Sequence, residues 1–138
     1  MDAGIIILFA AVLIVGAVLF AVITFGKRGK VLDVDKYRVR WLSIEQSLAR
    51  DNEASLHMAI INADKLVDQA LRDKGVTGQT MGDRLKASKT SFSQLDALWN
   101  AHKLRNKIAH EPNVAIGYDQ TRRALASFKR ALKDLGAI

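Results

Sequence analysis

The chain opens with a long apolar stretch that differs sharply from everything after it. Residues 3–26 contain no charged side chain, and most positions are isoleucine, leucine, valine, phenylalanine or alanine. As a helix this stretch would be about 36 Å long, enough to cross a bilayer core of about 30 Å. A helix that packs in a soluble core usually keeps a polar face, which this stretch lacks. The pattern therefore predicts a transmembrane anchor over residues 1–26.

Basic residues follow the apolar stretch at once and set its expected orientation. Lys27, Arg28 and Lys30 lie on this side, whereas the other side carries Asp2. Because positive residues stay on the cytoplasmic side of a membrane, the predicted topology is a single pass through the cell membrane with a cytoplasmic C-terminal domain. Anionic lipid headgroups are a second possible partner of this flank. Residues 27–34 are predicted to be a short basic juxtamembrane linker.

From residue 35 onward the apolar residues recur at steps of three and four, which is the period of amphipathic helices. Four main helices are predicted: one ends near residue 50, a long one ends at Gly75, one stops at Pro112, and one ends at Gly136. Glycine and proline are typical of helix ends. No convincing strand is present, so residues 35–138 are predicted to form an all-α, up-and-down four-helix bundle with one extra short helix.

Two capping patterns lie between the long helix and the helix before Pro112. Thr80 with Asp83 resembles a capping pair for the short helix, and Ser93 with Asp96 resembles a second pair for the helix that follows. Residues 75–82 contain three glycines. Without a preceding strand or a suitably placed lysine, this stretch indicates a connection between helices rather than a phosphate-binding loop.

Composition narrows the chemistry open to the chain. It has a net charge of +7, which favours an anionic partner such as nucleic acid or a membrane surface. It contains no cysteine, which excludes disulfides and thiolate metal sites. Of the three histidines, His57 is isolated, and His102 lacks the further ligands that a metal site would need. Neither a metal nor a cofactor is therefore predicted.

A polar group lies on the packing side of the helix that stops at Pro112. At about 100° per residue, Arg105 projects into the apolar side between Leu98 and Ala101. An arginine there is costly unless it is paired or functional. Two explanations stay open: the guanidinium binds a substrate phosphate, or it pairs with an acid of the long helix such as Asp64 or Asp68.

Two further residues of this helix suit proton transfer on a phosphodiester. Asn106 and His110 are four residues apart and share a helix face, so Asn106 is placed to orient the imidazole. Metal-independent cleavage of RNA uses the 2′-hydroxyl as nucleophile and requires a base, an acid and positive charge on the phosphate. Histidine titrates near neutrality, and arginine donates two hydrogen bonds to one phosphate.

The order Arg105-Asn106-x-x-x-His110 resembles the signature of the HEPN superfamily, small helical bundles common in prokaryotic toxin and defence systems. Many members are metal-independent endoribonucleases. The resemblance covers residues 35–135 and implies catalytic roles for Arg105, Asn106 and His110 in a composite site of a homodimer. It also implies an antitoxin or another protein partner. In some members a tyrosine two residues after the histidine is modified, and here that position holds Pro112.

Basic residues outside the motif are candidates for RNA contacts. The predicted nucleic-acid-binding residues are Lys103, Lys107, Arg122 and Arg123. The alternative for these residues is a solvated helix face. Trp41 and Trp99 lie on apolar stripes, which favours the core over base stacking. Two further functions stay open, a membrane-anchored interaction module and an RNA- or nucleotide-binding bundle that does not cleave.

Overall fold

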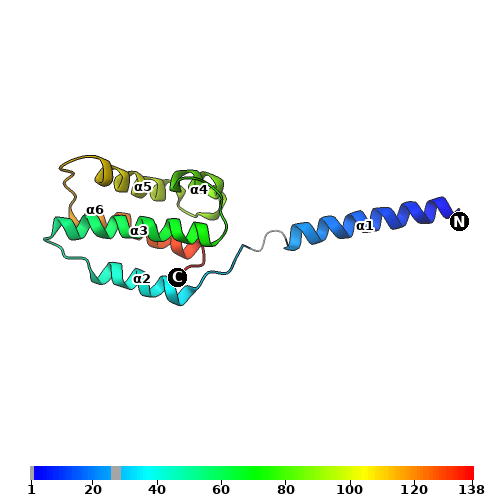
Figure 1. Ribbon diagram of the computed structural model, residues 1–138, viewed down its shortest axis with the longest axis horizontal. Helices are drawn as coiled ribbons and strands as arrows, with labels where there is room; N and C mark the ends of the chain where they lie inside the picture. The colour runs from blue at the N-terminus through cyan, green and yellow to red at the C-terminus, as the bar shows by residue number, and fades with distance from the viewer. Residues whose placement is uncertain (1, 26–28) are drawn as a thin grey trace. The chain divides into compact units, whose positions relative to one another are not determined.

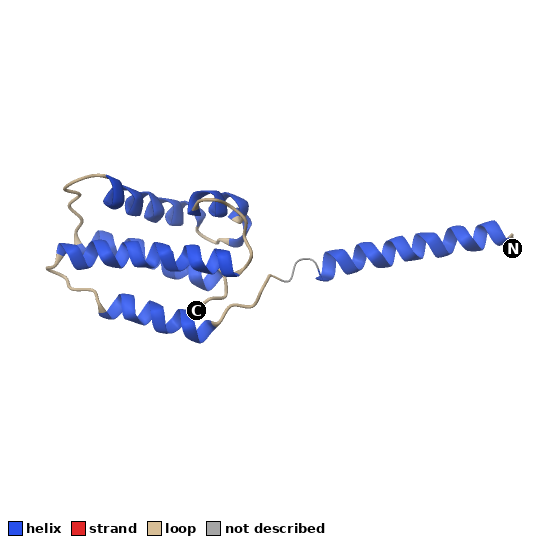
Figure 2. Cartoon of the chain, in the orientation of Figure 1, coloured by secondary structure: helices blue, strands red, loops and turns tan. Residues whose placement is uncertain are grey.

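The computed structural model describes residues 2–25 and 29–138, and within them every regular element is helical (Figures 1 and 2). The all-α prediction is confirmed. The chain divides into two units, residues 1–30 and residues 31–138. Lys27 and Arg28 of the predicted basic flank lie outside the described residues, whereas Lys30 is exposed.

The first unit consists of helix α1 (Ala3–Phe25). Its residues Ala3–Thr24 are long and apolar enough to cross a membrane, by length and composition alone. The hydroxyl of Thr24 donates a hydrogen bond to the carbonyl oxygen of Phe20 at 2.7 Å, so this polar group has a partner within the helix. Such internal pairing is what a helix surrounded by lipid requires.

The second unit is a four-helix bundle with one short extra helix, as the sequence predicted. The main helices run alternately up and down (Figure 1), and they are α2 (Val34–Gln46), α3 (Glu53–Asp73), α5 (Leu95–His110) and α6 (Tyr118–Asp134). The short helix α4 (Met81–Ala87) and a 3₁₀ turn (Lys89–Ser91) connect α3 to α5. Helix α3 is central, because it packs against α2, α4, α5 and α6.

The core of the bundle comes from apolar stripes on all four main helices. Ile60 and Leu71 of α3 and Phe128 and Leu132 of α6 are fully buried. Leu32 lies in the predicted linker, and it is also buried against this core. Every member of the core lies within residues 32–138. The second unit therefore has its own hydrophobic core and does not need α1 for it.

One predicted cap is confirmed and the other is wrong. Thr80 and Asp83 form a reciprocal capping box, with the Asp83 amide donating to the Thr80 hydroxyl at 3.1 Å and the Thr80 amide donating to the Asp83 carboxylate at 3.2 Å. Hydrogen bonding of the Asp83 carboxylate to the Thr80 side chain, followed by that to the Thr80 backbone amide, lowers the pKa of Asp83. Ser93 does not pair with Asp96. Its amide and hydroxyl both donate to the Asp134 carboxylate of α6 at 2.8 Å, and α5 has Gln94 instead of Ser93 as its N-cap residue.

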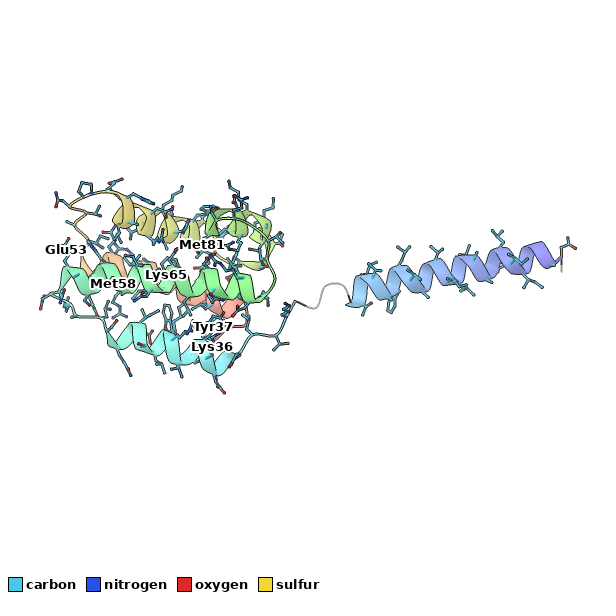
Figure 3. All side chains as sticks on the ribbon, viewed as in Figure 1. Lys36, Tyr37, Glu53, Met58, Lys65 and Met81 are labelled. Atoms are coloured by element: carbon cyan, nitrogen blue, oxygen red, sulfur yellow. The ribbon has the colours of Figure 1, made fainter. Side chains whose placement is uncertain are left out.

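A tyrosine–carboxylate pair joins α2 to the C-terminal end of α3. The Tyr37 hydroxyl donates to Asp73 at 2.6 Å, and the Gln69 amide donates to the other carboxylate oxygen at 2.7 Å. The bond from Tyr37 lowers the pKa of Asp73. Burial, followed by the bond to Asp73, raises the pKa of Tyr37. Figure 3 labels Tyr37 and its neighbour Lys36 on α2.

The Tyr37→Phe variant tests this pair through its pH dependence. Since the Asp73 pKa is lower in the folded state than the usual value of about 3.9, the ionised carboxylate stabilises the fold above that pH. This contribution is lost as pH falls through the folded pKa. Tyr37→Phe should lower the free energy of unfolding by about 1 kcal/mol at neutral pH and by less in acid, as measured by urea unfolding. Tyr118→Phe is the control, and an equal loss at both pH values for Tyr37→Phe would contradict the argument.

Candidate functional site

The three predicted catalytic residues line one open groove between α3, α4 and α5. The groove has a volume of about 630 Å³, and Arg105, Asn106 and His110 all border it. Lys65 of α3 and Met81 of α4, both labelled in Figure 3, border it from the facing helices. The motif of one helix thus faces residues that lie far away in the sequence.

The groove is rich in positive charge. Its basic lining residues outnumber its acidic ones, six to three: Lys65, Arg72, Arg84, Lys86, Lys103 and Arg105 against Asp64, Asp68 and Asp83. Asp68 is engaged by Arg84 at 2.6 Å and by Arg72 at 2.8 Å. Within the described residues no acidic group lies in ion-pair distance of Lys65, Lys86 or Lys103. A groove with this balance attracts anions such as phosphodiesters.

Four polar side chains form a closed network on the floor of the groove. Asp64 accepts a hydrogen bond from Nδ1 of His102 at 2.7 Å. The other ring nitrogen, Nε2, lies 3.3 Å from the Asn106 amide nitrogen. The Asn106 amide oxygen accepts from the Arg105 guanidinium at 3.0 Å. Nε of Arg105 lies 3.3 Å from the second Asp64 oxygen and completes the cycle.

The direction of these bonds assigns a tautomer to His102. Arg105 can only donate, so the oxygen of Asn106 faces it and the amide nitrogen faces the ring. The Nε2 atom of His102 must then accept, which leaves its hydrogen on Nδ1 facing Asp64. The network therefore fits a neutral His102 whose two ring nitrogens are both occupied.

The ion pair of Arg105 differs from the other pairs in the groove. Its Nε lies within ion-pair distance of Asp64, but the N–H is not directed at an acceptor and makes no hydrogen bond. Asp64 is only 3% exposed, so it is strongly constrained, whereas the side chain of Arg105 is 26% exposed. Attraction between charges holds the guanidinium, and part of it remains open to the groove.

The structure corrects one role expected from the spacing. Asn106 was expected to orient His110, but its amide contacts His102 and Arg105 instead. His102 also lies four residues from Asn106, and Asp64 holds its ring on the buried side of α5. His110 is the last residue of α5 and is exposed at the end of the groove.

Asp64 and His102 are the participants that sequence reasoning did not assign. Asp64 was named only as one possible partner of Arg105, and His102 was interpreted as a packed or partly solvated side chain. A signal was present, because Asp64 lies on the apolar stripe of α3 between Ile60 and Val67. A buried acid on one helix and an arginine on the packing side of a neighbouring helix together predict an ion pair.

The predicted RNA-contacting residues do not form one surface. Lys103 borders both the groove lined by Arg105 and a second groove of about 580 Å³ between α5 and α6, where Lys107 and Arg123 also lie. Arg122 lies elsewhere, with its guanidinium 6.0 Å from the ring centre of Tyr118. The four residues are therefore divided between separate parts of the bundle.

The two tryptophans differ in their surroundings. Trp41 is 3% exposed and belongs to the core, as expected. Trp99 is half-buried and borders the groove lined by Arg105, and its ring centre lies 5.9 Å from that of His102. Among the described residues no group of three or more histidine, aspartate or glutamate side chains has a geometry suited to a metal ion.

Comparison with known proteins gives no assignment, because no family model, no curated protein and no solved structure matches the chain. The resemblance to the HEPN superfamily therefore depends on the motif of α5 and on the all-helical architecture.

Proposed function

We propose that the chain is a membrane-anchored, HEPN-like endoribonuclease of a toxin or defence type that cleaves RNA without a metal. The observation that carries the proposal is that Arg105 and an exposed His110 border one cationic groove. A phosphodiester in this groove would meet both a fixed positive charge and a side chain that exchanges protons near neutral pH.

The reaction assigns a role to each motif residue. The 2′-hydroxyl attacks the adjacent phosphorus, a base takes its proton, and an acid protonates the departing 5′-oxygen, leaving a 2′,3′-cyclic phosphate. His110 is the proton-transfer group, because its ring is exposed to the groove. Arg105 stabilises the charge that builds up on the phosphate oxygens. Asn106 positions the guanidinium through its 3.0 Å bond to Arg105.

The chemistry requires a second proton-transfer group, and one groove supplies a single free histidine. Both ring nitrogens of His102 are occupied, and this side chain is 7% exposed. A second copy of the chain would bring a second His110 to a shared cleft. A homodimer with a composite site therefore follows from the proposed mechanism, and two-fold dimers are the commonest oligomers.

Sedimentation of residues 31–138 tests the dimer. The unit should sediment as a dimer at protein concentrations of tens of micromolar, and binding of a non-cleavable RNA analogue should strengthen association. His110→Ala should leave the dimer intact, because an exposed side chain contributes little to stability. A species that stays monomeric with and without the analogue would contradict the composite site.

Anchoring places this activity at a membrane. We propose that α1 crosses the cell membrane once with the bundle in the cytoplasm, because Lys27, Arg28 and Lys30 follow the apolar run. Protease added to intact cells should leave residues 31–138 uncut and should digest them after the membrane is permeabilised. Digestion of residues 31–138 in intact cells would show that the bundle lies outside the cell and would contradict the proposed topology.

A second candidate is a non-catalytic, membrane-anchored bundle that binds RNA, a nucleotide or a protein partner such as an antitoxin. The ion pair between Arg105 and Asp64 favours it, because that pair alone accounts for an arginine on the packing face. The position of Arg105 on the packing face therefore needs no contact with a second copy of the chain. The dimer now depends on the need for two histidines.

Incubation of residues 31–138 with mixed RNA in EDTA distinguishes the two candidates. The endoribonuclease should produce fragments with 2′,3′-cyclic phosphate ends, and His110→Ala should not. RNA binding that weakens with salt, without cleavage, would select a non-cleaving RNA-binding bundle. Neither activity, together with a stable protein partner in pull-down, would select the interaction module.

A further inference from the structure

Exposed apolar side chains of the second unit concentrate at its N-terminal edge. Among the described residues after α1, the exposed large apolar side chains are Val31 (97%), Val39 (67%), Leu42 (52%) and Met58 (51%). The first three belong to α2 and the segment that leads into it. Single exposed apolar residues are ordinary. Three of them in one short segment next to a predicted membrane anchor suggest that this segment contacts an apolar surface.

Helix α2 has two different sides. Tyr37, Trp41 and Ile44 are buried against the core and define its inner face. Val39 and Leu42 are three residues apart, so they are neighbours on the opposite side of the helix. The outer face of α2, which we define as Val39 and Leu42 together with Arg38, is exposed in the described bundle.

Positive charge accompanies this apolar pair. Arg38 lies four residues before Leu42, on the same side of the helix, and Lys30 precedes α2. Neither forms an ion pair within the described residues. Asp33 is a nearby acid, but its carboxylate accepts from the Lys36 amide at 3.1 Å and caps the helix. Asp35, in the first turn, lies four residues before Val39 on the same side of the helix, and Glu45 pairs with Lys129 of α6 at 2.9 Å.

The position of α2 in the chain limits how far it can move from the end of α1. Only residues 26–33 separate the two helices, and a chain of that length spans at most about 30 Å. A surface tethered within this distance of a bilayer experiences a high effective concentration of lipid headgroups. An attraction to lipid that would be negligible for a free domain is then sufficient to hold the tethered domain at the membrane surface.

We propose that the outer face of α2 docks onto the anionic headgroup surface of the membrane that holds α1. This inference rests on the proposed anchor and not on the proposed nuclease. Val39 and Leu42 insert at the boundary between headgroups and acyl chains, as the apolar residues of interfacial helices do. Arg38 and Lys30 contact anionic headgroups, and each such contact adds to the attraction.

A bilayer fits this face better than a second copy of the chain does. Pairing two α2 helices by a two-fold axis would place both copies of Arg38 in one contact, and like charges that share a contact repel. An anionic lipid surface is attracted by the same residue. Docking would also fix which side of the bundle faces the cytoplasm. In Figure 1 α2 and α5 lie on opposite sides of α3, so the groove lined by α5 would stay accessible.

A single fluorescent label tests the docking in the full chain. The sequence contains no cysteine, so Leu42→Cys carries one environment-sensitive dye and Asn100→Cys, exposed on α5, is the matched control. Both proteins are reconstituted into nanodiscs of phosphatidylcholine alone or with added phosphatidylserine. The dye at position 42 should shift to shorter wavelength and be quenched by headgroup-linked quenchers only with phosphatidylserine. High salt or an added Arg38→Glu should reverse the shift, and the dye at position 100 should not respond.

The same experiment separates failure of the docking from failure of the anchor. Chain that does not co-purify with nanodiscs would overturn the anchor, and the docking with it. Chain that co-purifies while the dye at position 42 stays solvent-exposed in both lipids would overturn the docking alone. A shift that is equal in both lipids and grows with the number of chains per disc would assign the face to a second copy and would also overturn the proposal.

Discussion

Replacing His110 by alanine should lower RNA cleavage by about 100-fold or more, because a proton-transfer group typically contributes at least that much. The bundle should stay folded. His110 is exposed at the end of α5, and no hydrogen bond of its side chain is present among the described contacts, so its loss should change the free energy of unfolding by about 0.5 kcal/mol or less. A gel-based cleavage assay and a circular dichroism melt on the same protein measure both quantities. A fully active His110→Ala protein would rule out the proposed mechanism.

Substitutions of the other motif residues should reduce cleavage as much as His110→Ala does, or less, depending on the residue. Arg105→Ala should reduce cleavage by a similar factor, because it removes the charge on the phosphate. Asn106→Ala should reduce cleavage by a smaller factor, since Asn106 acts through Arg105. Arg123→Ala is the matched control for charge, because Arg123 is exposed and lies in the separate groove between α5 and α6. Equal losses from Arg105→Ala and Arg123→Ala would indicate general attraction of RNA rather than catalysis.

Much of the fold follows from patterns that are local in sequence. Glycine and proline placed the ends of α3, α5 and α6 to within two residues, and Gly75 and Gly136 adopt positive φ angles of 83° and 72°. The first helix of the bundle was predicted to end near residue 50 without such a residue, and α2 ends earlier, at Gln46. The Thr80–Asp83 capping box was recognised because both partners lie within one turn of the same helix. The apolar stripes also predicted which side of each helix is buried, since a helix of known period has only one side rich in apolar residues.

The contacts between helices could not be predicted from local sequence patterns. Whether Arg105 meets Asp64 or Asp68 depends on how α3 and α5 are rotated and shifted relative to each other, and periodicity within one helix does not contain that information. In the structure Asp64 takes Arg105, while Asp68 is occupied by Arg84 and Arg72. The error at Ser93 has the same origin, because its partner Asp134 lies on α6. Local spacing predicted that Asn106 contacts a histidine ring four residues away, but the ring is that of His102 and not that of His110.

Removing the carboxylate of Asp64 should strongly destabilise the bundle. Asp64 is 3% exposed and serves both His102, at 2.7 Å, and Arg105, at 3.3 Å. Asp64→Ala leaves the guanidinium without its counter-charge and the His102 N–H without an acceptor. Breaking a buried pair from one side costs about 3–5 kcal/mol, so urea unfolding of residues 31–138 should show a loss of that size. Asp96→Ala, an exposed acid on α5, should change the free energy of unfolding by about 0.5 kcal/mol or less.

A double-mutant cycle shows whether this cost comes from the abandoned arginine. In the Asp64→Ala, Arg105→Met protein neither charge remains, and methionine fills much of the space of the arginine stem. The double variant should therefore recover about 1–3 kcal/mol relative to Asp64→Ala, an interaction energy typical of contacting residues. If the two losses simply add, Arg105 does not depend on Asp64, and its place on the packing face would have to be explained by a ligand in the groove. If Asp64→Ala itself costs less than about 1 kcal/mol, the network is not part of the stable core.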